Sequence, residues 1–523
     1  MTNPPAPAAS VPSPDESAVE VFAVYGVEPE VQAYAMARYS RSALSMKEAL
    51  KEITRQKAEK FLNTFYFQYG HRSIADLAHI ALAIEKLSIL AAIAVADEQR
   101  WDGQERSTRY QDFRQSGYTT PAFDGDQQAR ELYRDTIEVL FEAYQVISQR
   151  TFEYLAGITP RPGDMKPEVY ERTLRARAFD ISRYLLPLAT NTSLGEIVNA
   201  RTLESQVSHL LSHTHREVRR LGELLKQAAT SPAYDANRES LAALVEEIRA
   251  LSPDLAARAA AELLREVCVA PTLVKYADPS RYEIESRRAL RQAAAQLLRG
   301  TPIAPAKPVD LIDDEPMEVE LASTLLYEHC HHSYRQVRQA VQAAGEKLRR
   351  EIIDLGLCQR GPHDDVLRAF SAGQQFRFDI LMDIGGFRDL HRHRRCIQIG
   401  QGFTTRHGYD TPPELEAAGA RHRYDAAMKG AAAAVEQLAC RPGEETVENS
   451  QYAIPLGYRK RTLFKMDLAQ VVYITELRTG PGGHISYRSV AYAMYEAVAR
   501  RYPALARYFR VQDVREPVDL LKR

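Results

Sequence analysis

The sequence predicts an α+β fold in which helices outnumber strands and two similar halves follow one another. Long segments rich in Ala, Leu, Glu and Arg place apolar residues three and four positions apart, as in an amphipathic helix. A few short apolar, β-branched runs lie beside the chemically distinctive motifs. A proline-rich break, Thr301 to Pro308, separates regions with similar patterns. We therefore expect helix-rich domains, each built around a sheet that carries the chemistry.

Each predicted element follows from its apolar spacing. The predicted helices before the break are 33–62, 128–155, 165–185, 196–230, 238–270 and 281–299. The clearest helices after it are 319–355, 415–439 and 487–502. The predicted strands are Ile80–Ile84, Ile89–Val95, Phe376–Met382 and Cys396–Phe403.

The 523-residue length exceeds a single core and predicts more than one domain. The Pro/Ala/Ser-rich start lacks both a basic segment and an apolar core, so it is interpreted as a disordered tail. Tyr184-Leu-Leu-Pro187 is echoed by Tyr452-Ala-Ile-Pro455, which indicates an internal duplication. The expected division is a tail at 1–19, a first domain with a helical extension at 20–300, a linker at 301–318 and a second domain at 319–523.

Composition excludes several classes of protein. Lys and Arg total 68 against 69 Asp and Glu, so an extended nucleic-acid interface is not expected. The five cysteines are scattered, which favours reduced thiols in a cytoplasmic protein over disulfides or a structural zinc site. The most apolar run, Leu87 to Ala96, is shorter than the roughly 20 residues that span a bilayer. We expect a soluble protein without a membrane or metal site.

The first chemically distinctive motif is Gln104 to Tyr110. If this stretch is extended, Glu105, Ser107 and Arg109 share one face. An arginine beside a hydroxyl suits a phosphate, because a guanidinium binds phosphate with two parallel hydrogen bonds. On spacing alone, an ordinary solvated strand edge with a Glu–Arg pair is the preferred explanation.

The second motif, Arg392-His393-Arg394-Arg395, concentrates positive charge within four residues. Gly385-Gly386 precedes it and Gly400-Gln-Gly402 follows it, so the backbone can approach a ligand closely. Such donors suit the anionic edge of a reduced flavin. The alternative is a basic surface turn, which the surrounding apolar residues disfavour.

Other polar clusters are weaker signals. Asn199-Ala-Arg201 and Arg478 fit ordinary exposed or terminal positions of helices. His329-Cys330-His331-His332 invites a metal interpretation, but adjacent histidines on a helix do not face one ion, so a structural role is preferred. The sequence contains no P-loop, nucleophile elbow or Rossmann glycine motif.

Together, these residues resemble the flavin-dependent thymidylate synthases. That family's Arg-His-Arg segment is followed by Glu-x-Ser-x-Arg, with an upstream Gly-His-x-Ser/Thr and a downstream Leu-Pro and Asn-x-Arg helix. The first half offers Gly70-His71-Arg72-Ser73, Glu105/Ser107/Arg109, Arg183 before Leu186-Pro187, and Asn199/Arg201, but has Asp97-Glu98-Gln99 in place of Arg-His-Arg.

The second half has the complementary set. It keeps Arg392, His393 and Arg394, and also Arg478, where the first half has Leu210. Its Glu, Ser and Arg positions fall on Gly400, Gly402 and Thr404, its Asn-x-Arg positions on Asp467 and Ala469, and its Arg183 position on Gln451. In the family, sites lie at subunit interfaces and draw these two sets from different subunits. The resemblance thus implies a fused pseudo-dimer with one composite site retained and its symmetry mate lost, and a homodimer of such chains that mimics the family's tetramer.

The resemblance implies reductive methylation of dUMP to dTMP, with FAD as cofactor and NADPH and methylenetetrahydrofolate as co-substrates. Nucleotide binding would fall to Glu105, Ser107, Arg109, Arg183 and Arg478, and the catalytic flavin contacts to Arg392, His393 and Arg394. Ser73, Asn199 and Arg201 would contact the rest of FAD. Two alternatives are a diverged flavoprotein that acts on another nucleotide and a non-catalytic nucleotide-binding scaffold.

Overall fold

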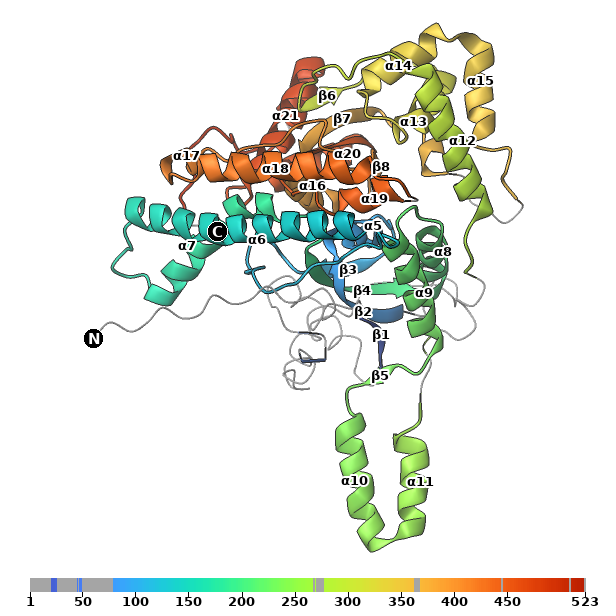
Figure 1. The fold of residues 1–523 in the computed structure, drawn as a ribbon, viewed down its shortest axis with the longest axis vertical. Helices are drawn as coiled ribbons and strands as arrows, with labels where there is room; N and C mark the ends of the chain where they lie inside the picture. The colour runs from blue at the N-terminus through green and yellow to red at the C-terminus, as the bar shows by residue number, and fades with distance from the viewer. Residues whose placement is uncertain are drawn as a thin grey trace. The chain divides into compact units, whose positions relative to one another are not determined.

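The computed structural model describes residues 20–25, 45, 47–48, 79–266, 269, 277–361, 367–443, 445–507 and 509–521. The chain forms two compact units. Unit 1 comprises Met1–Pro121 and Ala189–Pro279, and unit 2 comprises Ala122–Leu188 and Ser280–Arg523. Figure 1 shows a helix-rich molecule with small sheets, which confirms the α+β prediction.

Unit 1 contains a five-stranded sheet in the order β3-β4-β2-β1-β5. Its strands are β1 (Glu20–Tyr25), β2 (His79–Ser88), β3 (Asp102–Glu105), β4 (Asn191–Asn199) and β5 (Tyr234–Asp235). All neighbours are antiparallel except β1 and β5. The predicted strand Ile80–Ile84 is confirmed as part of β2, whose apolar residues are buried almost throughout.

Helices cover this sheet and extend from it. They are α5 (Ile89–Ala96), α8 (Ala200–Leu211), α9 (Arg216–Thr230), α10 (Arg238–Leu251) and α11 (Pro253–Leu263). Figure 1 shows α10 and α11 as a hairpin that projects from the sheet of this unit. The predicted helices at 196–230 and 238–270 are therefore divided, and residues 196–199 belong to β4 instead.

The predicted strand at Ile89–Val95 is wrong, because these residues form α5. Periodicity cannot separate a short buried strand from a short buried helix. The Ser88 side chain decides the outcome locally by accepting a hydrogen bond from the Ala91 backbone N–H at 3.0 Å, which caps the helix.

Unit 2 contains a four-stranded antiparallel sheet in the order β6-β7-β9-β8. Its strands are β6 (Val309–Leu311), β7 (Phe376–Asp383), β8 (Ile397–Gly400) and β9 (Arg459–Met466). The predicted strands at 376–382 and 396–403 are confirmed as β7 and, in a shorter form, as β8. β6 lies within 301–318, so part of the expected linker is a strand of the sheet. A three-residue strand is too short to show an alternating apolar pattern in the sequence.

The helices of unit 2 come from both halves of the sequence. Those before its sheet are α6 (Gln127–Ile158), α7 (Pro167–Ser182), α12 (Arg281–Leu297), α13 (Met317–Tyr327), α14 (Tyr334–Ala343) and α15 (Gly345–Leu355). The others are α16 (Ile384–His391), α17 (Glu414–Ala417), α18 (Arg421–Ala439), α19 (Thr446–Gln451), α20 (Leu468–Thr479), α21 (Ile485–Arg501) and α22 (Pro503–Ala506). The predicted helix at 319–355 is divided into α13, α14 and α15. The remaining predicted helices are found with shifted ends, except 33–62, which lies almost entirely outside the described residues.

The two sheets have the same topology. β1, β2, β3 and β4 correspond in chain order, neighbours and direction to β6, β7, β8 and β9. In each unit a short helix, α5 or α16, joins the second strand to the third. A shared strand order across nearly 300 residues supports the duplication inferred from sequence. The compact units nevertheless differ from the sequence halves, since α6 and α7 belong to unit 2.

The echoed Tyr-x-x-Pro segments meet within unit 2. The Leu188 N–H donates to the Ile454 carbonyl at 2.9 Å, and the Leu456 N–H donates to the Leu186 carbonyl at 2.9 Å. These reciprocal bonds join equivalent positions of the two repeats, as an isologous contact does around a two-fold axis. α6 likewise packs along α18, with an Arg423–Glu142 ion pair at 2.6 Å (Figure 1). Unit 2 therefore contains a local pseudo-dimer contact within one chain.

Candidate functional site

The Arg-His-Arg segment forms the turn that follows α16. The Asp383 carboxylate caps the start of this helix by accepting from the Gly386 N–H at 2.6 Å. Arg392 caps its end, and the His393 N–H donates to the Leu390 carbonyl at 3.1 Å. The short helix thus holds the turn between β7 and β8 in a fixed conformation.

His393 is buried and is held as a neutral imidazole. The Arg478 Nε–H donates to His393 Nε2 at 2.7 Å, so the ring proton must lie on Nδ1. Burial, and then the charge of Arg478, lowers the pKa of His393 to about 3. Tyr473 adds an edge-to-face ring contact at 5.7 Å. The arrangement offers an uncharged Nδ1–H donor beside fixed guanidinium charge.

A second set of bonds fixes the carbonyl side of the turn. The His393 carbonyl accepts from Cys396 Sγ at 2.8 Å and from Gln398 Nε2 at 3.1 Å. Gln398 also contacts His391 Nδ1 through its Oε1 at 2.9 Å. Burial raises the pKa of Cys396 to about 12, so its thiol stays protonated and serves as a donor, not a nucleophile.

Arg183 lies in the same unit, in a short 3₁₀ turn after α7. Its side chain is only 2% exposed, and its terminal nitrogens lie 3.4 and 3.5 Å from Asp389 Oδ2. Asp389 also interacts electrostatically with His393. Asp383 is a further neighbour of Arg183; burial raises the pKa of Asp383 to about 6, and Arg183 opposes this shift. The structure therefore brings Arg183, His393 and Arg478 together around α16.

The other motif, Gln104 to Tyr110, lies in unit 1. Glu105 ends β3, where it pairs with Leu194 of β4. Ser107 Oγ accepts from the Arg109 N–H at 3.2 Å, and Thr108–Tyr110 form a turn. The stretch is therefore extended only as far as Ser107, and the predicted alternation does not reach Arg109, because the Ser107 side chain bonds the local backbone. Glu105 and Arg109 are nevertheless both buried.

Arg106, which sequence reasoning passed over, holds this turn. Its Nε donates to Gln111 Oε1 at 3.0 Å, and its terminal nitrogens bond Ser116 Oγ at 2.9 Å and the Asp112 carbonyl at 3.0 Å. The guanidinium also lies 4.2 Å from the Phe113 ring centre. It is a structural residue; no sequence signal separates it from its neighbour Arg109.

The other predicted cofactor residues differ in what the structure shows. Asn199 is the last residue of β4 and caps α8 by accepting from the Thr202 N–H at 2.8 Å. Arg201 lies in the first turn of α8. Ser73 lies outside the described residues. Asp467, the counterpart of Asn199, caps α20 in the same way through the Gln470 N–H at 2.8 Å.

The two repeats also contain a partly buried hydroxyl–carboxylate pair that the sequence did not reveal. In unit 1, the Ser88 hydroxyl donates to Glu217 Oε2 at 2.6 Å. In unit 2, the Ser486 hydroxyl donates to Asp383 Oδ2. Ser88 and Asp383 cap the corresponding helices α5 and α16, while Glu217 and Ser486 are the second residues of α9 and α21. Hydroxyl and carboxylate have changed places, which only the three-dimensional correspondence reveals.

Within the described part of the chain, no group of three or more His, Cys, Asp or Glu side chains has the geometry of a metal site. The same part contains no helix long and apolar enough to cross a membrane.

A fold with two copies of one sheet topology, each with a short helix between its second and third strands, defines a class of duplicated two-unit proteins. The model of the thymidylate synthase complementing protein family, Thy1, matches residues 24–231 and 312–504. The chain therefore belongs to this family, with a family segment in each half.

Two relatives align with nearly the whole chain. A UPF0159 protein of Chlamydia pneumoniae is 26% identical over 548 aligned positions, which cover 96% of this chain and 93% of the relative. A UPF0159 protein of Thermoplasma acidophilum is 25% identical, with 91% and 94% coverage. A flavin-dependent thymidylate synthase of Clostridium tetani is 26% identical over 35% of this chain and 71% of its own length.

A solved structure, the UMP/dUMP methylase PolB from Streptomyces cacaoi bound with 5-Br dUMP, covers 40% of this chain and 90% of its own. It is 19% identical with a TM-score of 0.23. At that TM-score the likeness adds nothing to the description of this chain.

Proposed function

We propose that the protein is an FAD-dependent thymidylate synthase that methylates dUMP reductively to dTMP. Methylenetetrahydrofolate would supply the carbon that bonds to uracil C5, with loss of the C5 proton, and NADPH would supply the reducing equivalents through the flavin. Membership of the family and the named activity of the Clostridium tetani relative support this proposal. The substrate is accordingly a uridine nucleotide.

The observation that carries the proposal is the complementary loss of residues. Unit 2 keeps Arg392, His393, Arg394 and Arg478, and unit 1 keeps Glu105, Ser107 and Arg109. The corresponding positions of the other repeat have lost these side chains. Independent decay of two copies would remove residues from both sets. Selection for one composite site, to which each repeat contributes one set, explains why the losses are complementary.

The donors of unit 2 fit an anionic flavin edge. Arg478 fixes the His393 tautomer, so a neutral Nδ1–H donor stands beside guanidinium charge. The Arg478 guanidinium otherwise lies 5.4 Å from the Tyr487 ring, and no described carboxylate pairs with it. Preorganised donors of this kind stabilise negative charge without reorganisation. We therefore assign the flavin to Arg392, His393 and Arg394, with Ser73, Asn199 and Arg201 toward the rest of FAD.

The remaining residues suit the nucleotide. Arg109, Arg183 and Arg478 would bind the dUMP phosphate, and Ser107 would add a hydroxyl donor. Asp389 holds the Arg183 guanidinium, which keeps a buried cation in place until an anion arrives. Glu105 would lie near the flavin and the uracil. Two chains would associate as a homodimer, in line with the tetramers of the family.

Spectroscopy and a substrate assay on the purified full-length chain test the proposal. We expect flavin absorbance, and tritium release from 5-labelled dUMP that requires both methylenetetrahydrofolate and NADPH. Flavin absorbance without tritium release would favour the diverged flavoprotein that acts on another nucleotide. Absence of flavin binding would favour the nucleotide-binding scaffold.

Two variants test the composite site. His393→Ala should weaken FAD binding and Arg109→Ala should weaken dUMP binding, each by about 10- to 100-fold, because a charge-assisted or preorganised hydrogen bond is lost. Arg109→Lys should weaken dUMP binding less, since it keeps the charge. Arg500→Gln, an exposed change on α21, is the control. If both alanine variants leave flavin and nucleotide binding intact, the composite site is wrong.

A further inference from the structure

A cavity of 530 Å³ in unit 2 lies beside the histidine-rich segment that follows α13. Its volume falls within the roughly 300–1,000 Å³ range of small-molecule sites. None of the ten lining residues is among the residues assigned above to flavin or nucleotide. The lining consists of Ala294, Ala295, Leu298, Thr301, Ile303, His329, Cys330, His331, His332 and Arg406. Half of them, from Ala294 to Ile303, lie outside both segments matched by the family model.

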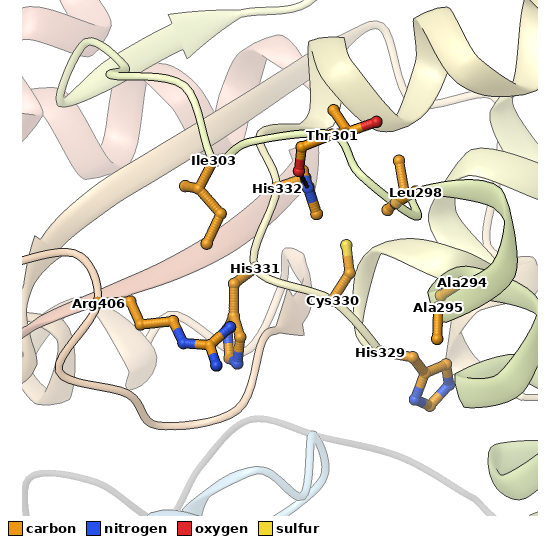
Figure 2. Close-up of a pocket in the computed structure, with 10 residues that line it drawn as sticks. All are labelled: Ala294, Ala295, Leu298, Thr301, Ile303, His329, Cys330, His331, His332 and Arg406. Carbon is orange, nitrogen blue, oxygen red and sulfur yellow. Dashed lines mark hydrogen bonds between the residues drawn. The ribbon is translucent and has the colours of Figure 1, made fainter. Parts of the chain in front are cut away.

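The lining has a basic side and an aliphatic side. Figure 2 shows the Arg406 side chain against His331, with Ala294, Ala295 and Leu298 on the opposite side. Arg406 is exposed, and no described carboxylate pairs with its guanidinium. No residue of the lining carries a carboxylate. The cavity thus combines a cation with an apolar wall.

The surroundings of the cavity are positively charged. Burial, and then Arg406 and Lys460, lowers the pKa of His331 to about 4. Burial lowers the pKa of His329; Glu328 opposes this shift, and Arg287 and Arg291 add to it, although Arg287 also pairs with Glu283 at 3.7 Å and Arg291 with Glu448 at 4.0 Å. Burial raises the pKa of Cys330 to about 11, so its thiol adds no negative charge. The balance of charge around the cavity favours an anion.

Two buried polar atoms of the lining lack hydrogen-bond partners among the described residues, which also favours a ligand. Nδ1 of His331 and Nδ1 of His332 are buried and have no hydrogen-bond partner among the described residues. His332 is otherwise anchored, with Nε2 2.7 Å from the Thr301 carbonyl and its own carbonyl accepting from Gln401 Nε2 at 2.8 Å. Because the Thr301 carbonyl can only accept, Nε2 of His332 donates to it, and Nδ1 of the neutral ring can only accept. Nδ1 of His331 can instead carry its ring proton and donate to an acceptor oxygen of a ligand, and orphaned buried groups of this kind are rare in folded proteins.

The cavity adjoins the loop after β8. This loop corresponds to the loop after β3 in unit 1, which contains Ser107 and Arg109. Gly400 ends β8 as Glu105 ends β3, and a Cβ at Gly402 would lie 3.9 Å from His331 Cε1. This loop has lost the Glu-x-Ser-x-Arg residues, but it carries Arg406 two positions beyond Thr404. The second repeat therefore carries a cation in this loop at a position where the first repeat has Gln111, and α12 supplies an apolar wall.

We propose that this cavity binds a small organic anion, with its phosphate or carboxylate against Arg406 and His331 and its apolar body against Ala294, Leu298 and Ile303. The site is an accessory one, separate from the residues assigned to dUMP and FAD. It does not depend on the reaction proposed above, because none of its lining residues is assigned there to flavin or nucleotide.

Calorimetric titration of the full-length chain with phenyl phosphate tests the site. Phenyl phosphate should bind more tightly than inorganic phosphate, because its ring adds contact with the apolar wall. Benzoate in place of phenyl phosphate distinguishes a carboxylate from a phosphate site. Arg406→Gln should weaken phenyl phosphate binding by about tenfold or more, since a charge-assisted contact is lost.

A matched pair on α12 provides an independent variant. Ala295→Glu places a carboxylate at the exposed rim of the cavity and should weaken binding as Arg406→Gln does. Gln296→Glu makes the same change of charge one residue away, outside the lining, and should bind like wild type. Binding that is absent, or unchanged in Arg406→Gln and Ala295→Glu, overturns the proposal.

Arg109→Gln separates this site from the proposed nucleotide site. Phenyl phosphate binding that disappears in Arg109→Gln but survives in Arg406→Gln belongs to the nucleotide site and overturns the accessory site alone. Binding that follows Arg406 in a protein without affinity for dUMP supports the accessory site while the proposed function fails.

Discussion

At the scale of single residues, the structure shows how one predicted site residue orients another. Arg478 and His393 are 85 residues apart in sequence, and although the family resemblance places them in one set, only the structure shows that they bond directly. The bond from Arg478 Nε fixes both the tautomer and the neutral state of His393. The turn therefore presents a defined donor before any ligand binds, which is what electrostatic preorganisation requires.

His393 should make the stability of unit 2 depend on pH. Its folded pKa of about 3 lies below the ordinary value of 6.5, because of burial and Arg478. Above pH 6.5, His393 is neutral in both the folded and the unfolded state. As the pH falls toward 3, His393 gains a proton only in the unfolded state, so the folded state loses stability. Relative to His393→Gln, wild type should lose about 2 kcal/mol between pH 7.5 and pH 5. Urea unfolding at both pH values measures this; parallel losses in the two proteins would contradict it.

At the scale of elements, α16 and the turn after it position Arg392, His393 and Arg394. They follow β7, the second strand of the unit 2 sheet. α16 can begin at Ile384 because Asp383 caps it and because two glycines let the backbone approach its neighbours. A Cβ at Gly386 would lie 2.4 Å from Ser486 Oγ and 2.9 Å from Met382 Cε, so α16 and α21 are in direct contact there. The glycine pair, assigned from sequence to ligand approach, serves helix packing at Gly386.

Gly386→Ala should destabilise the protein by about 1–3 kcal/mol, because the added methyl displaces Ser486 or Met382 in a packed interior. Gly430→Ala is the matched control, since a Cβ at Gly430 in α18 meets nothing within 4 Å. The control should be neutral or stabilising by up to about 1 kcal/mol, because alanine favours a helix over glycine. Thermal unfolding of both variants measures the difference, and equal melting temperatures would show that α16 has room at this position.

The exchanged hydroxyl–carboxylate pair allows a double-mutant test in unit 1. Ser88→Asp alone should destabilise by about 1–3 kcal/mol, because it sets a second carboxylate against Glu217. Adding Glu217→Ser recreates the arrangement of Asp383 and Ser486, and should recover most of the loss. Denaturant unfolding of the two single variants and the double variant gives the coupling energy. A coupling near zero would mean that the positions do not interact in solution.

At the scale of the whole molecule, duplication explains both the two sheets and the reciprocal bonds at Pro187 and Pro455. A homodimer needs the same surface on both partners, whereas a fused pair can let its copies diverge. Under the proposed composite site, the loss of one residue set from each repeat is the expected result.

The fused chain should bind one FAD, not two. The symmetry mate of the composite site would combine Asp97-Glu98-Gln99 with Gly400, Gly402 and Thr404, which offer no cation to flavin or phosphate. Release of the flavin by denaturation and measurement of its absorbance against protein concentration gives the ratio. Sedimentation equilibrium should give twice 59.0 kDa if two chains associate. A ratio of two flavins per chain would show that the second site is intact.

The sequence by itself determined the features that depend on local pattern and on residue identity. Helical periodicity located α6, α7, α12 and α18, and the motifs identified the family without any structure. The duplication was also visible in sequence, because the Tyr-x-x-Pro segments and the two basic motifs recur in order.

Only the tertiary structure decided the features that depend on distant partners. Residues 89–95 form a helix rather than a strand because of a cap and a buried environment that periodicity does not encode. The membership of α6 and α7 in unit 2, the Arg183–Asp389 pair and the exchange of Ser88–Glu217 for Asp383–Ser486 all join segments far apart in the chain. Their energies come from burial and hydrogen bonding between those segments, so no local pattern could reveal them.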